Sequence, residues 1–153
     1  MIFRTHIAFA FLIGLFFYFH NLVDNWILFF LFLFLGAGFP DVDNSESKFG
    51  RNFLSKATTL FSKHRKIFHS LLLGAALSYL FFIYDNDAGI GFFVAFVSHI
   101  ILDSFTIEGI NFLYPFGKFT FRGFIKTGGR LETVLFYVLA VADIILLFSS
   151  QSF

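Results

Sequence analysis

The sequence predicts an all-α integral membrane protein, a helical bundle of about five transmembrane helices in a single domain that spans residues 1–153. Composition is the first observation behind this prediction: 58% of the 153 residues are hydrophobic, 29 are Phe, and the mean hydropathy is +0.80. A soluble domain of this length cannot bury so much apolar surface. The second observation is a series of long runs without charged residues, and the third is the one-sided distribution of Lys and Arg.

Charged residues divide the chain into five apolar runs, each comparable with the roughly 20 residues that a helix needs to cross a bilayer core of about 30 Å. The runs are residues 5–23, 25–40, 67–84, 88–102 and 133–153. The second and fourth are the shortest, and we expect those helices to extend into their polar flanks. Asp143 interrupts the fifth run, and the sequence gives it no specific role.

All eleven Lys and Arg residues fall on one side of the membrane that these runs imply. The connections on the other side carry Asp24, Asp85 and Asp87 but no base. The positive-inside rule therefore predicts a multi-pass protein of the cell (inner or plasma) membrane, with a cytoplasmic N-terminus and the C-terminus outside. A net charge of only +1 gives no sign of nucleic-acid binding. The basic loops are topology signals first, and contacts to anionic lipid headgroups are their second interpretation.

Residues 104–130 are expected to form an irregular segment on the cytoplasmic side, between the fourth and fifth helices. Five glycines and Pro115 interrupt both the helical and the strand patterns there. Aromatic and basic side chains recur between them, which is typical of a segment lying along a membrane surface. We expect this segment to cover the cytoplasmic helix ends.

Polar residues gather at the cytoplasmic ends of the five runs, where a bundle would bring them together without long-range loop folding. Those with metal-binding side chains are His6, Asp41, Asp43, His64, His69, His99, Asp103 and Glu132. Ionisable groups at membrane depth are costly and usually functional. Because the chain has no Cys, any transition metal must be held by imidazole and carboxylate groups.

The pair His99 and Asp103 is the strongest local signal, because residues four apart on a helix lie on the same side. The alternative is a helix-end His that is hydrogen-bonded to its own Asp. Asp41 and Asp43 follow Pro40, which disfavours continuation of the second helix. They suit a bridging metal ligand, or one carboxylate that binds metal and a second that supports it. The other interpretation is that the two acidic residues begin a solvated loop.

His64 and His69 lie five residues apart and cannot both face one ion from a straight helix. Either the third helix starts between them, or one binds metal while the other is an acid, a base or a substrate contact. Ser70 is a candidate N-cap of this helix, and Arg65 is either a phosphate ligand or a topology charge. His20 belongs to the opposite membrane face and is excluded from the site.

In this order, the polar residues resemble the signature of the YdjM-like family of inner-membrane proteins described as metal-dependent hydrolases. The resemblance rests on Thr5, His6, Pro40, Asp41, Val42, Asp43, His64, Arg65, His69, Ser70, Ser98, His99, Leu102, Asp103, Thr106, Gly109, Tyr114, Pro115, Phe116, Gly128, Gly129 and Glu132. It implies a multi-pass helical hydrolase whose metal ligands match His6, Asp41, His64, His69, His99 and Asp103. The pattern is also similar to the all-helical zinc-dependent phospholipase C and nuclease group, which suggests phosphoester cleavage, but Gly128 stands where that group has a further His.

We therefore predict a metal-dependent hydrolase at the cytoplasmic membrane face, acting on a phosphoester or lipid-linked substrate with one or two divalent ions, preferably Zn²⁺. The expected metal ligands are His6, Asp41, His69, His99 and Asp103. Asp43, His64 and Glu132 are expected to be catalytic, and Arg65 to bind substrate. The alternative is a non-catalytic membrane protein in which a structural metal, or a His and carboxylate cluster, joins the helix ends. Transport ranks last, because the first, second and fourth runs offer almost no polar residues away from the cytoplasmic end.

Overall fold

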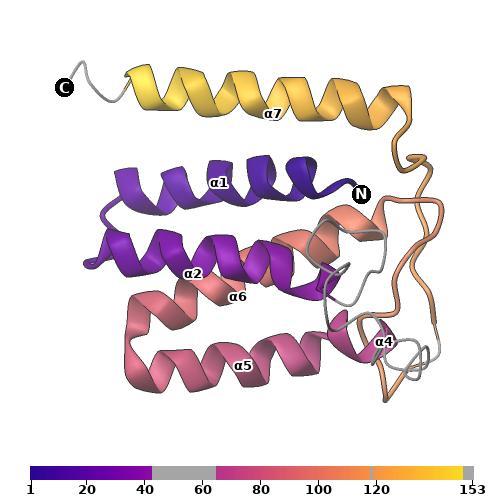
Figure 1. Ribbon diagram of the computed structural model, residues 1–153, viewed down its shortest axis with the longest axis horizontal. Coiled ribbons are helices and arrows are strands. Elements are labelled where there is room, and N and C mark those ends of the chain that lie inside the picture. The colour runs from indigo at the N-terminus through magenta and orange to yellow at the C-terminus, as the bar shows by residue number, and fades with distance from the viewer. Residues whose placement is uncertain (43–64, 118, 150–153) are drawn as a thin grey trace.

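The computed structural model describes residues 1–42, 65–117 and 119–149, and it is all-helical within these ranges. Five helices match the five predicted runs (Figure 1): α1 (Phe3–Phe19), α2 (Trp26–Gly38), α5 (Leu71–Tyr84), α6 (Asn86–Ser104) and α7 (Arg130–Ser149). A 3₁₀ turn, η1 (Phe39–Asp41), extends α2, and a short helix, α4 (Arg65–Phe68), precedes α5. The described ranges contain two isolated β-bridges and no strand. The predicted all-α class is confirmed.

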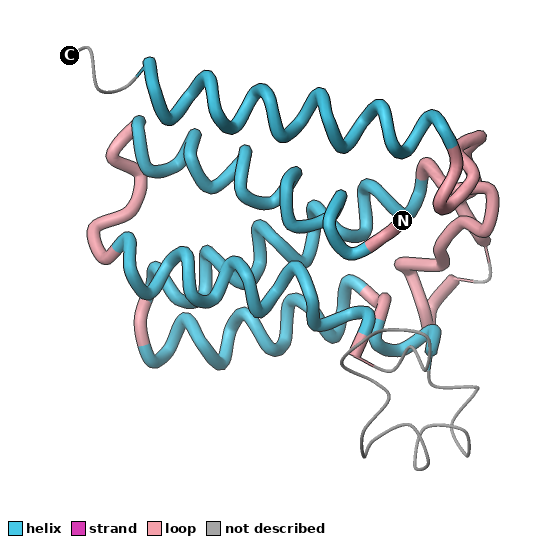
Figure 2. The backbone as a smooth tube through the Cα atoms, turned by 45° about the horizontal axis from the view of Figure 1, so that its top comes forward, coloured by secondary structure: helices cyan, strands magenta, loops and turns pink. Residues whose placement is uncertain are grey.

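Helix α6 forms the centre of the bundle. Both α2 and α5 pack on it, α1 packs on α2 and α6, and α7 packs mainly on α1 at one edge (Figure 1). The chain enters α1, α5 and α7 at the same end of the bundle at which it leaves α2 and α6 (Figures 1 and 2). The polar residues that the sequence places at these five helix ends therefore lie at one end of the molecule.

The contact between α2 and α6 depends on glycines that let the two backbones approach closely. A methyl group on Gly36 would clash with the carbonyl oxygen of Phe92, and one on Gly91 would clash with the carbonyl oxygen of Phe29. Around this crossing, Phe29, Leu33 and other side chains are fully buried. Small residues at helix crossings are typical of membrane proteins, where close van der Waals packing drives helix association. This crossing fixes the end of α2 relative to α6.

At the end of the bundle away from the polar cluster, buried Asp87 joins two turns. Its Oδ2 atom accepts hydrogen bonds from the backbone nitrogens of Asp24 and Asn25, 3.0 Å away in the case of Asp24. Asp85 caps α6, and the Asn25 side chain caps α2 by accepting from the Leu28 nitrogen. Asp85 and Asp87, two of the acidic residues predicted for this side, therefore accept hydrogen bonds from backbone nitrogens at its turns, as N-cap chemistry favours.

The segment between α6 and α7 is irregular, as predicted, and folds back on the end of α6 (Figure 2). Its backbone is fixed by bridges that pair Thr106 with Ile125 and Ile110 with Phe121. The Thr106 nitrogen and hydroxyl both donate to the Asp103 carbonyl oxygen, at 3.0 and 2.7 Å. The segment is thus attached directly to the last turn of α6, where the Asp103 side chain lies.

Two helices are long and apolar enough to cross a membrane: α6, with 19 residues, and α7, with 20. The other apolar helices are shorter, at 17 residues for α1, 13 for α2 and 14 for α5. A helix needs about 20 residues to span a typical bilayer core. That all five helices cross the membrane therefore stays a prediction, although each coincides with a predicted apolar run.

Candidate metal centre

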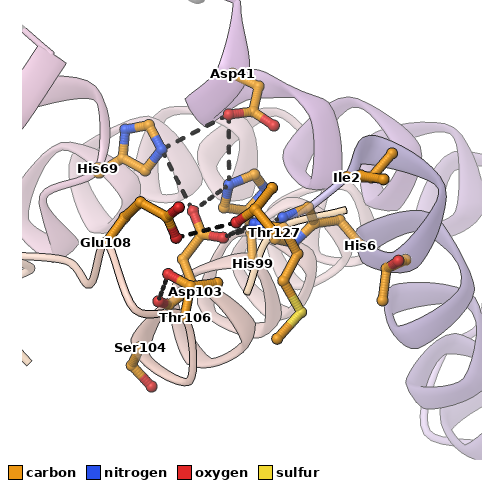
Figure 3. Close-up of polar contacts among 12 residues, drawn as sticks. Ile2, His6, Asp41, His69, His99, Asp103, Ser104, Thr106, Glu108 and Thr127 are labelled. Carbon is orange, nitrogen blue, oxygen red and sulfur yellow. Dashed lines mark hydrogen bonds and ion pairs between the residues drawn. The ribbon is translucent and has the colours of Figure 1, made fainter. Parts of the chain in front are cut away.

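Five side chains predicted to bind metal meet at one end of the bundle (Figure 3). His6 comes from α1, Asp41 from η1, His69 from the joint before α5, and His99 and Asp103 from α6. Asp103 is central. Its Oδ1 atom lies 3.3 Å from Nε2 of His6, and its Oδ2 atom lies 3.3 Å from Nε2 of His99 and 3.7 Å from Nε2 of His69. Asp41 Oδ1 lies 3.8 Å from His69 Nε2 and 3.9 Å from His99 Nε2, and the N-terminal ammonium of Met1 pairs with Asp103 Oδ1.

The approach to Asp41 is shaped by Pro40. The α-helix ends at Gly38, and the tighter 3₁₀ turn that follows carries the proline in its first positions, where the missing N–H group costs nothing. Asp41 is the last residue of this turn and points into the cluster (Figure 3). The predicted end of the helix is confirmed, but the chain turns through a 3₁₀ helix and does not open into a loop at once.

His69 reaches the cluster because two helices meet beside it. Helix α4 ends at Phe68, and Ser70 caps α5 by accepting a hydrogen bond of 3.2 Å from the Leu73 nitrogen. The predicted cap is confirmed. His69 therefore lies in the short joint between α4 and α5, outside any straight helix, so the angular conflict between His64 and His69 does not apply to its orientation.

The position of His99 is fixed from the opposite side of its ring. Its Nδ1 atom lies 2.9 Å from the carbonyl oxygen of Ala37 in the last turn of α2. A carbonyl oxygen only accepts hydrogen bonds, so Nδ1 must carry a proton, and the lone pair of the neutral ring lies on Nε2. A backbone carbonyl in this role is typical of metal-binding histidines, since it sets the tautomer and the ring orientation.

This tautomer places two hydrogen-bond acceptors against each other. The Nε2 lone pair of His99 faces Oδ2 of Asp103, and an ionised carboxylate has no proton to donate. The contact is favourable only if a cation lies at this point, either a proton on Nε2 or a metal ion bound by both atoms. Nε2 of His99 is fully buried and has no hydrogen-bond partner of good geometry. Buried polar atoms without partners are rare and call for an explanation.

His6 makes protonation of both rings a poor explanation. Its imidazole stacks on that of His99 with ring centroids 3.7 Å apart and planes inclined by 8°. Two protonated rings at this distance would repel each other strongly in a buried site. Neither nitrogen of His6 makes a hydrogen bond of good geometry, although Nε2 lies close to Asp103. A divalent ion could bind the Nε2 atom of each ring while both rings stay neutral.

The spacing of the ligand atoms fits such an ion. In a tetrahedral zinc site with ligands about 2.0–2.1 Å from the metal, the ligand atoms lie about 3.3 Å from one another. Two groups have ligand atoms that all lie within 4.8 Å of one another: His6, Asp41 and His99, and His69, His99 and Asp103. Three imidazoles and two carboxylates are a donor set that zinc and other divalent transition metals accept.

Both groups share His99, which has consequences for the number of ions. Since Nδ1 of His99 is taken by Ala37, only Nε2 is free to bind metal. One imidazole nitrogen binds one ion. The two groups are therefore alternative selections of ligands for a single ion, and a second ion would have to be held without His99.

One side of the cluster is open and the other is closed. The side chains of His6 and His99 have no exposed surface, whereas those of His69, Asp103 and Asp41 are 13%, 15% and 20% exposed. The closed side lies against the helix core, and the open side is formed by η1, the α4–α5 joint and the end of α6. His69 and the two carboxylates are therefore the members of the cluster nearest to the surface.

Glu132 lies next to the cluster but is fully engaged elsewhere. Its Oε1 atom accepts hydrogen bonds from the Ile2 nitrogen and, at 3.1 Å, from the Thr5 hydroxyl, and its Oε2 atom accepts one of 2.6 Å from the Gly128 nitrogen. The carboxylate is 1% exposed. These contacts tie the start of α7 to the start of α1 and favour a positioning role over the catalytic role expected from the sequence.

We predict that Glu132→Gln lowers the stability of the protein by about 1–3 kcal/mol. The NH₂ group of the new amide would face at least one of the three groups that now donate hydrogen bonds to the carboxylate, and that bond would be lost. The expected result is a lower thermal unfolding temperature in detergent, with the metal content unchanged. Glu108→Gln is the matched control, since the exposed Glu108 accepts one side-chain hydrogen bond, from Thr127. Loss of metal at an unchanged unfolding temperature would place Glu132 in the metal centre instead.

The remaining residues singled out in the sequence lie partly inside and partly outside the described ranges. Asp43 and His64 lie outside the described residues, and Arg65 begins α4, where the structure describes its backbone but not its side chain. His20 ends α1 at the far end of the bundle and is exposed, so its exclusion is confirmed. Asp143 is buried on α7, and its Oδ1 atom has no hydrogen-bond partner. The stack of His6 on His99 and the carbonyl of Ala37 had no signal in the sequence.

The family model described as YdjM inner membrane protein matches residues 1–152. The chain is also similar to the uncharacterized protein YvsG of Bacillus subtilis (strain 168), with 32% identity over 114 residues that cover 71% of each chain. No solved structure matches the chain significantly.

Proposed function

Given that the chain belongs to the YdjM inner membrane protein family, we propose that it is a metal-dependent hydrolase whose site opens at the cytoplasmic face of the membrane. The observation that carries the proposal is the facing pair of acceptors, Nε2 of His99 and Oδ2 of Asp103, which requires a cation. His6, Asp41, His69, His99 and Asp103 would hold that ion, and zinc suits the donor set best.

A divalent ion at this place would supply a Lewis acid that activates water for attack on an ester. The residues of the chain would do the rest. Ala37 holds the ring of His99 in the tautomer that presents Nε2, and the tight turn at Pro40 presents Asp41. Arg65 would bind a phosphate oxygen, and Asp43 or His64 would accept the proton of the attacking water.

The proposed substrate class is a phosphoester that is part of a lipid or linked to one. The centre lies at the end of a bundle whose helices are covered with exposed apolar side chains, so its open side lies near the lipid headgroups if the helices cross the membrane. A lipid can reach such a site by lateral diffusion without leaving the bilayer. A divalent ion, a basic side chain and a partly exposed edge would together serve phosphoester hydrolysis.

A second candidate is supported by the burial of His6 and His99, which have no exposed surface. Structural metal sites are closed, and this centre joins α1, the end of α2, the start of α5 and the end of α6. In this alternative the ion holds the helix ends together and no reaction follows. The partial exposure of Asp41 and Asp103 favours the hydrolase.

Removal of the metal distinguishes these functions, and we predict that it abolishes hydrolysis reversibly. Protein purified in detergent would be depleted with a chelator and resupplied with Zn²⁺, Mn²⁺ or Mg²⁺, with metal content, thermal unfolding and hydrolysis of a panel of phospholipids and lipid phosphates measured at each step. A hydrolase loses turnover on depletion and regains it with one of the ions. A structural centre unfolds at a lower temperature on depletion while the replete protein cleaves none of the esters, and that result would rule out the proposal.

A further inference from the structure

An apolar groove on the surface of α5 begins beside the candidate metal centre. Its volume is about 440 Å³, and its walls include Ile67, Ser70, Leu73, Ala76, Tyr114 and Pro115. Ile67 and Ser70 flank His69, whose imidazole faces Asp41 and Asp103. The groove therefore begins at the residues on either side of His69 in the chain.

The groove extends from the centre toward the middle of α5. Ser70, Leu73 and Ala76 are spaced by three residues and share one face of the helix, so the groove follows that face for about 9 Å at 1.5 Å per residue. The hydroxyl of Ser70 is engaged as the cap of α5. The lining thus offers little for a polar ligand, and its length suits a linear apolar one.

The second wall of the groove, formed by Tyr114 and Pro115, belongs to a segment that is hydrogen-bonded to α5. The Leu71 nitrogen donates a 2.9 Å hydrogen bond to the carbonyl oxygen of Phe112, and the Asn111 side chain donates one of 2.8 Å to the carbonyl oxygen of Gly117. The first bond is made just before Tyr114 and Pro115 in the sequence, and the second joins residues that lie on either side of them. The groove is formed by the fold before any ligand arrives, as is usual for small-molecule sites.

The side chains around the groove indicate which kind of ligand it binds. Leu72, which also lines the groove, is exposed, and so are the neighbouring large apolar side chains Tyr79, Leu80 and Ile83 on α5. On a membrane protein such a surface is in contact with lipid chains. We propose that the groove binds one acyl chain of a lipid whose phosphate headgroup lies at the His and Asp cluster. The place of the headgroup rests on the proposed function, whereas the chain site rests on the groove itself.

Ala76→Trp tests the groove, because an indole at this position would fill it. Ala75→Trp is the matched control, since Ala75 is the preceding residue, is exposed on the same helix and does not line the groove. The probe is a phosphatidic acid with a photoreactive diazirine in one acyl chain, presented in phosphatidylcholine nanodiscs. The wild type and Ala75→Trp should be labelled at residues 67–76 and 112–117, and Ala76→Trp should lose most of that labelling.

A kinetic measurement follows if the protein hydrolyses phosphatidic acid. Blocking the burial of even two methylene groups weakens binding about tenfold, so Ala76→Trp should raise KM for a dipalmitoyl substrate about tenfold. The same variant should leave kcat/KM for a dihexanoyl substrate and the metal content unchanged. Ala76→Phe is a milder variant that answers the same question if the tryptophan prevents folding.

The outcomes separate the chain site from the proposed function. Labelling of the groove that Ala76→Trp removes, without hydrolysis of any ester, supports the chain site and contradicts the hydrolase. Hydrolysis without labelling of the groove contradicts the chain site alone. Equal labelling of the wild type and both variants, or labelling spread over the whole outer surface, would overturn the proposal.

Discussion

Replacement of His99 by alanine should remove the metal from the protein. The imidazole is the one side chain common to both groups of potential ligands. Mutations of supporting residues alone cost about 10–100-fold in metal affinity, so loss of a ligand should cost on the order of 100-fold or more. Metal analysis of the purified variant and titration with Zn²⁺ would measure the effect.

His20→Ala is the control for this experiment, because His20 is the exposed histidine at the other end of the bundle. It should keep the metal content and the activity of the wild type. A His99→Ala protein that retains its full metal content would show that α6 does not contribute the ligand pair. Retention of activity on lipid phosphates without metal would exclude metal-dependent hydrolysis.

Replacement of Gly36 by alanine should destabilise the whole bundle. The new methyl group would clash with the backbone of Phe92, which cannot rotate away as a side chain can. Overpacking typically costs about 1–3 kcal/mol, and a clash with backbone belongs at the upper end of this range or beyond it. Because domains are stable by only about 5–15 kcal/mol, we expect a large fall in thermal stability and in the yield of folded protein.

Gly38→Ala provides the comparison, since Gly38 lies two residues further along α2 and a methyl group there meets the end of the Phe3 ring, 3.2 Å away. That ring can shift by a few tenths of an ångström, so the unfolding temperature in detergent should change little. Equal stability of the two variants would mean that α2 and α6 do not need their close approach.

The local features of the site were predictable where short-range geometry decides them. His99 and Asp103 meet because four residues make about one helical turn, and Ser70 caps α5 because a hydroxyl before an apolar run satisfies a free backbone nitrogen. The gathering of His6 and Asp41 at the same end followed from the alternation of helix directions. These predictions needed only periodicity and charge.

Other features depend on distances that a sequence does not encode locally. Glu132 opens α7 as predicted, but its Oε1 atom accepts hydrogen bonds from Ile2 and Thr5 near the start of α1, more than a hundred residues away in the chain. Helix α4 and the joint that orients His69 depend on packing against η1. Helices α1, α2 and α5 are also shorter than the predicted runs: α1 ends before the uncharged His20, α2 passes into a 3₁₀ turn after Gly38, and α5 begins only after its Ser70 cap.

The position of α7 sets it apart from the other long helices. None of the five clustered side chains comes from α7, which packs mainly along α1 and is tied to the start of that helix through Glu132. A truncated chain without α7 would therefore keep all five described members of the candidate centre and lose the anchor that Glu132 provides for the start of α1.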